Sequence, residues 1–166
     1  MFLGMSTYTL IHTLISLVML FSGIVVVIGL LGSQRLNGWS ALFLLSGVAT
    51  SATGFGFPFS HLLPSHILGI MSLVVLVVAI LARYAFHFGG AWRWTYAVGV
   101  VVALYFDVFV AIVQAFQKIP ALTPLAPTQS EPPFAIAQGI ALVIFVVLAI
   151  VSVVKFHPLT ASDLSH

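Results

Sequence analysis

Five long apolar stretches, separated by short polar or proline-containing segments, dominate the sequence. Each supplies about 19–24 residues, and about 20 helical residues at ~1.5 Å per residue cross the ~30 Å hydrocarbon core of a bilayer. The pattern therefore predicts an all-α integral membrane protein, a bundle of five transmembrane helices in a single domain, 1–166. The predicted helices cover residues 8–31, 39–57, 66–86, 94–116 and 134–156.

The longest connection between two predicted helices, residues 119–133, contains five prolines. Because proline lacks the amide N–H and disrupts a helix interior, this segment cannot be one continuous helix. Pro132 and Pro133 suit the first turn of the last helix, where an amide would have no helical partner. A proline-rich loop of this length is typical of an ordered lid or a partner surface, with disorder as the alternative.

The distribution of basic residues predicts an orientation. With five helices, Arg35, Arg83, Arg93 and Lys155 fall on one side of the membrane, and Lys118 falls on the other. Since basic residues accumulate on the cytoplasmic side, we expect the N-terminus outside, the C-terminus inside and the proline-rich loop in the periplasm. The aromatic residues that suit interface anchors at the cytoplasmic helix ends are Trp39, Tyr84, Trp92, Trp94 and Tyr96.

The composition supports the membrane class and excludes several functions. Hydrophobic residues make up 61% of the chain and charged residues 5%, far from the balance of a soluble domain. The chain has no cysteine, which excludes disulfides and thiolate chemistry. Its five Lys and Arg residues are scattered and form no patch for nucleic acid. The expected partners are the lipid bilayer and further copies of the chain or other membrane subunits.

A carboxylate near the middle of the fourth predicted helix is the most unusual feature. A charged group at that depth costs a few kcal/mol, so Asp107 is expected to face protein or water. Small residues, which permit close helix contacts in lipid, share its helix face. These residues are Gly99, Ala103, Ala111 and Ala115. The sequence leaves three roles open for Asp107: a structural hydrogen-bond acceptor, a proton or ion site, and a substrate contact.

Other polar residues gather toward the outer ends of the predicted helices. His12 lies about one turn inside the first helix, His66 opens the third, and Gln138 lies about one turn inside the fifth. We therefore expect a polar pocket that opens to the periplasm and has Asp107 near its floor. The residues expected in this ligand- or ion-binding site are His12, His66, Asp107, Gln114, Glu131 and Gln138.

Two cofactor hypotheses rest on the histidines. His12 and His66 are expected at similar depth, which would allow bis-histidine haem, and with Glu131 or Asp107 they would suit a metal ion. No haem-attachment motif, HExxH motif or tight histidine cluster accompanies them. The cofactor therefore stays open, with none favoured and haem as the alternative, and no metal site is predicted. The sequence also lacks a serine or cysteine arrangement typical of nucleophilic catalysis, and we expect a protein that is not an enzyme.

Two segments carry a resemblance to known proteins. They are Leu-Pro-Ser-His at 63–66, which opens a helix ending in Ala-Arg-Tyr at 82–84, and Ala-Pro-Thr-Gln-Ser-Glu-Pro-Pro-Phe at 126–134. With them, most of the chain resembles small bacterial inner-membrane proteins of uncharacterised activity. The resemblance implies a bacterial cytoplasmic membrane and brings no activity. The helices that carry histidine are also loosely similar to b-type cytochrome bundles, whose paired histidines on both membrane sides are not matched.

Three functions follow as expectations. The leading one is a non-enzymatic membrane subunit or small binding protein with a polar pocket that faces the periplasm. The second is a proton- or ion-coupled transporter or channel that uses Asp107. The third is a haem or metal redox protein that uses His12 and His66.

Overall fold

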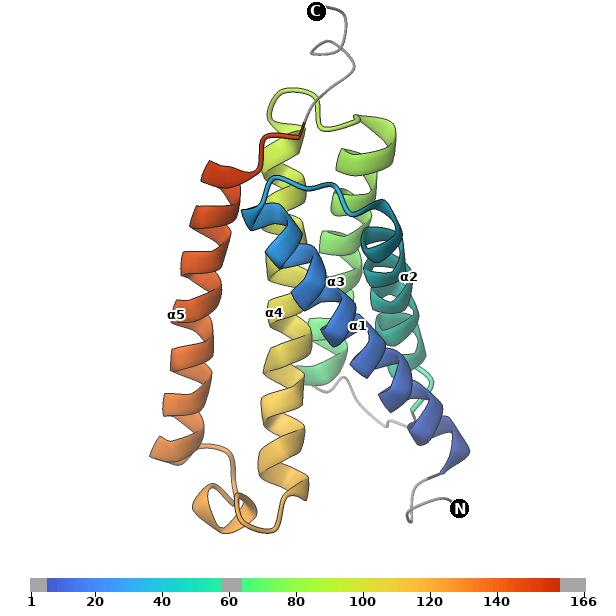
Figure 1. Cartoon of the computed structure of the whole chain (residues 1–166). Coiled ribbons are helices and arrows are strands. Elements are labelled where there is room, and N and C mark those ends of the chain that lie inside the picture. Colours follow the sequence, from blue (N-terminus) through green and yellow to red (C-terminus); the bar gives the residue numbers. More distant parts are fainter. Residues whose placement is uncertain (1–5, 58–63, 159–166) are drawn as a thin grey trace, which may run out of the picture.

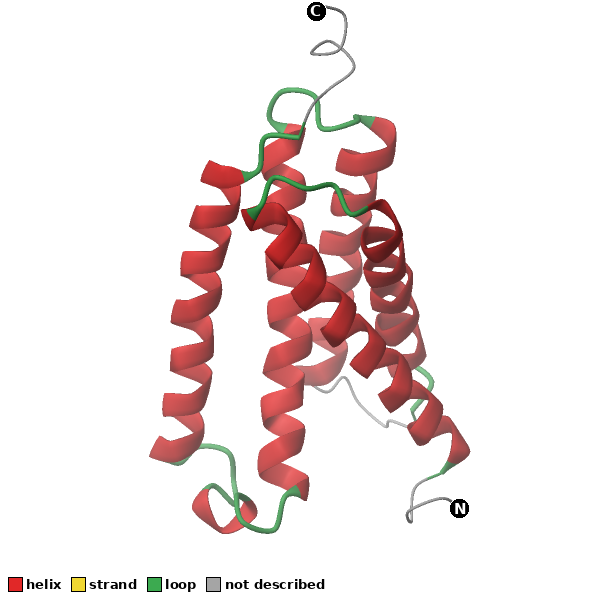
Figure 2. Cartoon of the chain, viewed as in Figure 1, coloured by secondary structure: helices red, strands yellow, loops and turns green. Residues whose placement is uncertain are grey.

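The computed structural model describes residues 6–57 and 64–158, and all regular structure in these ranges is helical (Figures 1 and 2). The predicted all-α architecture of five helices is confirmed, and the helix ends lie within three residues of their predicted positions, except that α3 itself ends at Ile80, six residues before the predicted end. Beyond α3 the chain continues as a π-helical turn, Leu81–Ala85. The helices are α1 (Thr7–Leu31), α2 (Asn37–Gly54), α3 (Pro64–Ile80), α4 (Trp92–Lys118) and α5 (Pro132–Lys155).

Four of the helices are long and apolar enough to cross a membrane: α1, α3 with its π-helical turn, α4 and α5. The exception is α2, which has 18 residues and is rich in Ser, Thr and Gly. Its hydroxyl groups bond to the preceding helical turn, as Ser46 Oγ does with the Leu42 carbonyl at 2.7 Å. Of the five predicted spans, four are therefore supported by length and apolarity, and the span of α2 stays a prediction.

The central helix is α4, which contacts α1, α3 and α5 (Figure 1). Its interior face is a stripe of Tyr96, Val100, Ala103 and Asp107, at spacings of i+4, i+7 and i+11. The first three side chains have no exposed surface. Asp107 continues the stripe and therefore lies on the helix face that points into the bundle.

Glycine allows α1 to approach its neighbours closely. A Cβ atom on Gly23 would lie 2.7 Å from Leu104 Cδ1 and 2.8 Å from Phe43 Cε2. A Cβ on Gly47 of α2 would lie 3.0 Å from Leu76 Cδ2. The side chains around these two glycines are at most 2% exposed, and we call them the apolar layer. Its members are Met19, Phe43, Leu76, Val100 and Leu104.

The two ends of the bundle differ in charge. At one end lie the α1–α2 connection, the α3–α4 connection and the last turn of α5 (Figure 1). This basic end carries Arg35, Arg83, Arg93 and Lys155. At the opposite end, which we call the far end, α1 begins and the loop between α4 and α5 joins Lys118 to Glu131. The arrangement has the charge asymmetry on which the predicted orientation depends.

The loop between α4 and α5 has the interrupted structure that its prolines predict. It is interrupted by a short 3₁₀ turn, Thr123–Leu125, and is not a continuous helix. Prolines occupy the first positions of α5, as expected. Phe116 at the end of α4 packs edge-to-face against Phe134 of α5, with the ring centroids 5.5 Å apart. The loop is therefore an ordered turn between two neighbouring helices.

Candidate functional site

Asp107 has a buried oxygen that lacks a hydrogen-bond partner. Its Oδ2 atom is buried and accepts no hydrogen bond from the residues that the structure describes. The neighbouring interior side chains of α4, Ala103 and Leu104, are apolar and buried. An unpaired carboxylate oxygen in such surroundings is costly. A proton, a water molecule, a cation or a donor from a ligand would satisfy this oxygen.

Two more buried oxygens without partners face this half of the bundle. They are Thr50 Oγ1 on α2 and Gln138 Oε1 on α5; a further one, Ser152 Oγ, lies nearer the basic end. Gln138 Nε2 donates to the Phe109 carbonyl of α4 at 3.2 Å. Since Phe109 is two residues from Asp107, Gln138 meets α4 at a similar depth to the carboxylate. Three helices thus contribute an unpaired oxygen to the half nearer the far end.

His12 is held by α2. Its Nδ1 lies 2.8 Å from Thr53 Oγ1. That hydroxyl also lies 2.7 Å from the Ala49 carbonyl. In the tautomer in which it donates its single proton to that carbonyl, Thr53 accepts from His12 and Nδ1 carries a proton. In the neutral imidazole, Nε2 is then the nitrogen with a lone pair. His12 also packs edge-to-face on Phe57, with the ring centroids 5.1 Å apart.

We predict that Thr53→Val destabilises the protein through His12. Valine keeps the shape but leaves the Nδ1 proton without an acceptor, at a cost of about 1–3 kcal/mol. The measurement is unfolding in mixed micelles, followed by circular dichroism as the fraction of SDS rises. The control is a double-mutant cycle with His12→Phe, in which the cost of Thr53→Val should largely vanish. Additive effects of the two changes would show that the bond contributes nothing.

His66 lies beside Phe55, the residue that follows α2. It is buried in α3, and its ring centroid lies 5.7 Å from that of Phe55. Nearby, Ser51 Oγ of α2 donates to Ser72 Oγ of α3 at 3.2 Å. Of the two candidate haem ligands, His12 therefore contacts α2 and His66 contacts the residue that follows α2. Within the described ranges, no three His, Asp or Glu side chains come together as a metal site.

The described hydrogen bonds do not link Glu131 or Gln114 to Asp107. Glu131 Oε1 accepts from Thr128 Oγ1 at 2.8 Å and Glu131 Oε2 accepts from the Ser130 amide at 3.1 Å. The carboxylate of Glu131 thus accepts hydrogen bonds from residues of the loop that leads into α5. Gln114 is half-buried on α4. Among the described residues, no hydrogen bond joins either of them to Asp107.

A pH titration should reveal the Glu131 contacts. Desolvation raises the pKa of this carboxyl, but hydrogen bonds from Thr128 and from the backbone outweigh it and hold the pKa below the ordinary 4.5. Because the folded-state pKa is depressed, the stabilisation is present above the unfolded-state pKa and is lost as pH falls through the folded-state pKa. NMR titration of the Glu131 carboxyl should give a midpoint that rises toward the ordinary value in Thr128→Val, which removes the hydroxyl donor and keeps the backbone donors. An unchanged midpoint would mean that the Thr128 contact is absent in solution.

Two shallow grooves on the surface have apolar walls. One, of about 460 Å³, lies between α3 and α4 and is lined by residues such as Val78 and Val102. The other, of about 350 Å³, lies between α1 and α2. Neither is lined by Asp107, His12 or Gln138. The polar pocket expected around those residues therefore stays a prediction.

The sequence interpretation missed a buried polar network at the basic end. Arg83 is 6% exposed. Its Nη1 donates to the Tyr96 hydroxyl at 3.1 Å, and its Nη2 donates to Asn37 Oδ1 at 2.6 Å and to the Arg35 carbonyl at 3.2 Å. The Tyr96 hydroxyl donates to Ser40 Oγ at 3.0 Å. One guanidinium group therefore joins α3 and α4 to the start of α2.

Three aromatic rings support this network, and we call them the aromatic hub. Phe88, Tyr96 and Phe156 have pairwise ring centroid distances of 5.0, 5.5 and 5.8 Å. The guanidinium carbons of Arg83 and Arg35 lie 5.4 and 5.3 Å from the Phe88 ring. All the described acceptors of Arg83 are neutral. Its charge is thus solvated by dipoles and rings but is not neutralised by a carboxylate among the described residues.

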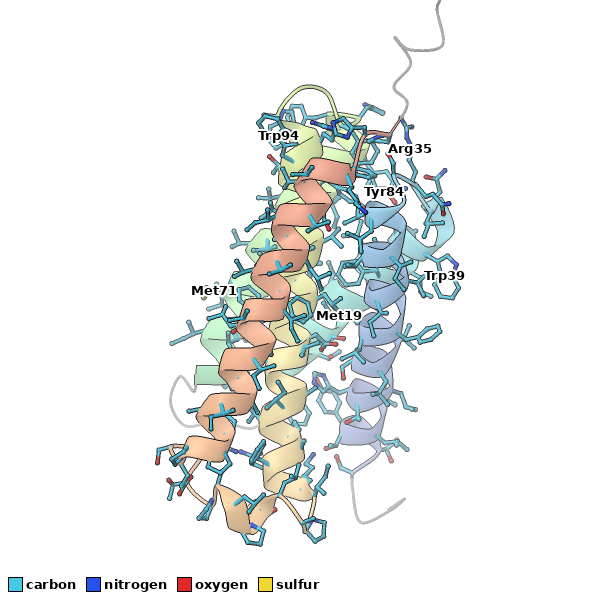
Figure 3. The ribbon with its side chains drawn as sticks, turned by 60° about the vertical axis from the view of Figure 1, so that its left-hand side comes forward. Met19, Arg35, Trp39, Met71, Tyr84 and Trp94 are labelled. Atoms are coloured by element: carbon cyan, nitrogen blue, oxygen red, sulfur yellow. The ribbon has the colours of Figure 1, made fainter. Side chains whose placement is uncertain are left out.

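Helical periodicity was the signal that could have identified Arg83 as buried. The helix face that starts at Ser72 continues with Leu76 at i+4, Ala79 at i+7 and Arg83 at i+11. All four side chains are buried. The expectation that Tyr96 anchors the interface is wrong, because this side chain is fully buried in the hub. The anchors Trp39, Tyr84 and Trp94 are 39%, 51% and 50% exposed, as expected for that role (Figure 3).

Comparison of the chain with protein-family models, curated proteins and solved structures found no match.

Proposed function

We propose that this chain is a non-enzymatic integral protein of the bacterial inner membrane. It acts as a membrane subunit or small binding protein, with its N-terminus outside and its C-terminus inside. The polar half near the far end, around Asp107, is its binding site for a cation or a small ligand with hydrogen-bond donors.

The unpaired Oδ2 of Asp107 carries this proposal. A carboxylate oxygen on the interior face of an apolar helix, with no donor among the described residues, is an incomplete polar site. Ionisable groups inside membrane segments are costly and are commonly tied to function. The unpaired oxygens of Thr50 and Gln138 add acceptors in the same half. The carboxylate and amide oxygens can only accept, and the Thr50 hydroxyl can accept or donate, so the set favours an electropositive ligand.

The apolar layer supports access from one side only. On α4, Val100 and Leu104 lie between the basic end and Asp107, and their exposed fractions are 0% and 2%. Phe43 and Leu76 close the same level from α2 and α3. Water finds no polar partner in such a layer. A ligand of Asp107 therefore enters from the far end, the periplasmic side in the proposed orientation.

Single-cysteine labelling tests this access, because the natural chain has no cysteine. Thr50→Cys should react with a charged, membrane-impermeant methanethiosulfonate in spheroplasts, where only the outer face is exposed. The matched control, Val100→Cys in the apolar layer, should stay unlabelled. Labelling only after the cells are opened would place the site on the inner side. Equal labelling of both variants would remove the apolar layer as a barrier.

The second candidate is proton- or ion-coupled transport, which the same unpaired carboxylate favours. One membrane carboxylate and a hydrated path suffice for such coupling. In proteoliposomes loaded with a pH-sensitive dye, the wild-type protein should dissipate an imposed gradient and Asp107→Asn should not. Equal expression of the variant serves as the control, and flux that persists in Asp107→Asn would eliminate this candidate.

A further inference from the structure

Positive charge is concentrated at the basic end beyond what orientation alone requires. Arg93 and Lys155 lie at helix ends there, and Arg83 is buried at the same end. The acidic residues of the described ranges, Asp107 and Glu131, lie elsewhere: the first in the middle of α4 and the second at the far end. The positive charge of Arg93 and Lys155 therefore attracts a negative partner from outside the bundle.

Two of these basic residues are brought together by the end of α5. Arg93 Nη1 donates to the Phe156 carbonyl at 2.8 Å, which holds the guanidinium group beside the last turn of α5. Lys155 directly precedes Phe156 and is exposed. The aromatic hub fixes this geometry, because Phe156 is completely buried against Phe88 and Tyr96. The two side chains thus approach the same part of the surface from α4 and α5.

The surroundings of Arg93 indicate the depth of this surface in a bilayer. Its guanidinium carbon lies 5.6 Å from the ring of Trp94, which is half exposed. Exposed tryptophans settle at the headgroup level of membranes. Trp94, Tyr84 and Arg35 lie near the same end in Figure 3. Arg93 and Lys155 are therefore at the level of lipid phosphates.

We propose that the basic end binds the phosphate group of acidic phospholipids in the adjacent leaflet. Arg93 and Lys155 contact the headgroup, and the charge of Arg83, buried at the same end of the bundle, strengthens the attraction. Each base near an anionic membrane surface favours binding about fivefold. This inference rests on the membrane insertion proposed above, and it adds a specific lipid class as partner.

Electron spin resonance of spin-labelled lipids measures this selectivity. The full chain is reconstituted in phosphatidylcholine vesicles, and the motionally restricted fraction is compared for labelled phosphatidylglycerol and labelled phosphatidylcholine. We expect the wild-type protein to prefer phosphatidylglycerol severalfold. The double variant Arg93→Gln and Lys155→Gln should lose most of that preference. Lys118→Gln, which removes the base at the far end, is the matched control and should keep it.

Other outcomes overturn the proposal in distinguishable ways. Equal preference in the wild-type protein and the double variant would show that these two bases do not hold the headgroup. If Lys118→Gln lost the preference to the same extent, the preference would depend on the net charge of the protein and not on the basic end. Competition by millimolar inorganic phosphate at constant ionic strength would identify a soluble anion as the ligand. A chain that fails to float with vesicles of either lipid would contradict membrane insertion itself.

Discussion

Gly23→Leu should be among the most destabilising substitutions in this chain. Even a Cβ at this position would lie 2.7 Å from Leu104 and 2.8 Å from the Phe43 ring, and leucine adds three more carbons. The Leu104 methyl can rotate, but the ring belongs to the apolar layer and has no exposed surface. Overpacking of this kind costs about 1–3 kcal/mol or more. Unfolding in mixed micelles as the SDS fraction rises measures the loss.

Gly139→Leu is the matched control for this substitution. Gly139 also lies inside a long apolar helix, but nothing lies within 4 Å of a Cβ built there. Helix propensity favours leucine over glycine, so this variant should be as stable as the wild-type protein or more so. Equal losses in the two variants would mean that α1 does not pack against α4 through Gly23.

Arg83→Leu should have the second large effect. Leucine leaves the Asn37 amide oxygen, the Arg35 carbonyl and the Tyr96 hydroxyl without the donor that each of them has. Asn37 and Arg35 are exposed, so water can replace the lost donor there, whereas the Tyr96 hydroxyl is completely buried. Since a buried group without a partner costs about 1–3 kcal/mol, we expect a loss of about that size in the free energy of unfolding. The same micelle titration measures it.

Two companion variants separate the causes. Arg83→Lys keeps the charge but cannot reach three acceptors with a planar fork, so an intermediate loss is expected. Lys155→Leu removes an exposed base at the same end, and its effect should stay within about 0.5 kcal/mol. The network would have no structural role if Arg83→Leu were as stable as Lys155→Leu.

The helices could be predicted because their signals are local. Each helix is a long apolar run that ends at polar residues, glycine or proline, and Pro132 and Pro133 mark the start of α5 at the observed residue. The inward position of Asp107 was also predictable, because Ala103 and Gly99 share its interior side of the helix. These features depend on periodicity along one segment and on no contact between segments.

The aromatic hub was not predicted, because it depends on contacts between distant segments. Phe88 lies in a turn with a φ of 63°, and Phe156 lies after the last helix. Neither position suggests a core residue when the sequence is read alone. Arg83 was assigned to the membrane surface because basic residues at helix ends are common there. The neutral acceptors that make its burial possible come from the start of α2 and from α4.

The position of Phe156 has a consequence for biosynthesis. This residue follows the last helix and completes the hub, and the next amide, that of His157, donates to Ser33 Oγ at 2.8 Å. Along the rest of α5, Ala141 and Ser152 are the buried positions. A nascent chain in which Phe156 has not yet left the ribosome therefore lacks the third ring of the hub. The hub forms only after α5 has been made, and a chain that terminates before Phe156 should be recognised by quality-control proteases as unfinished.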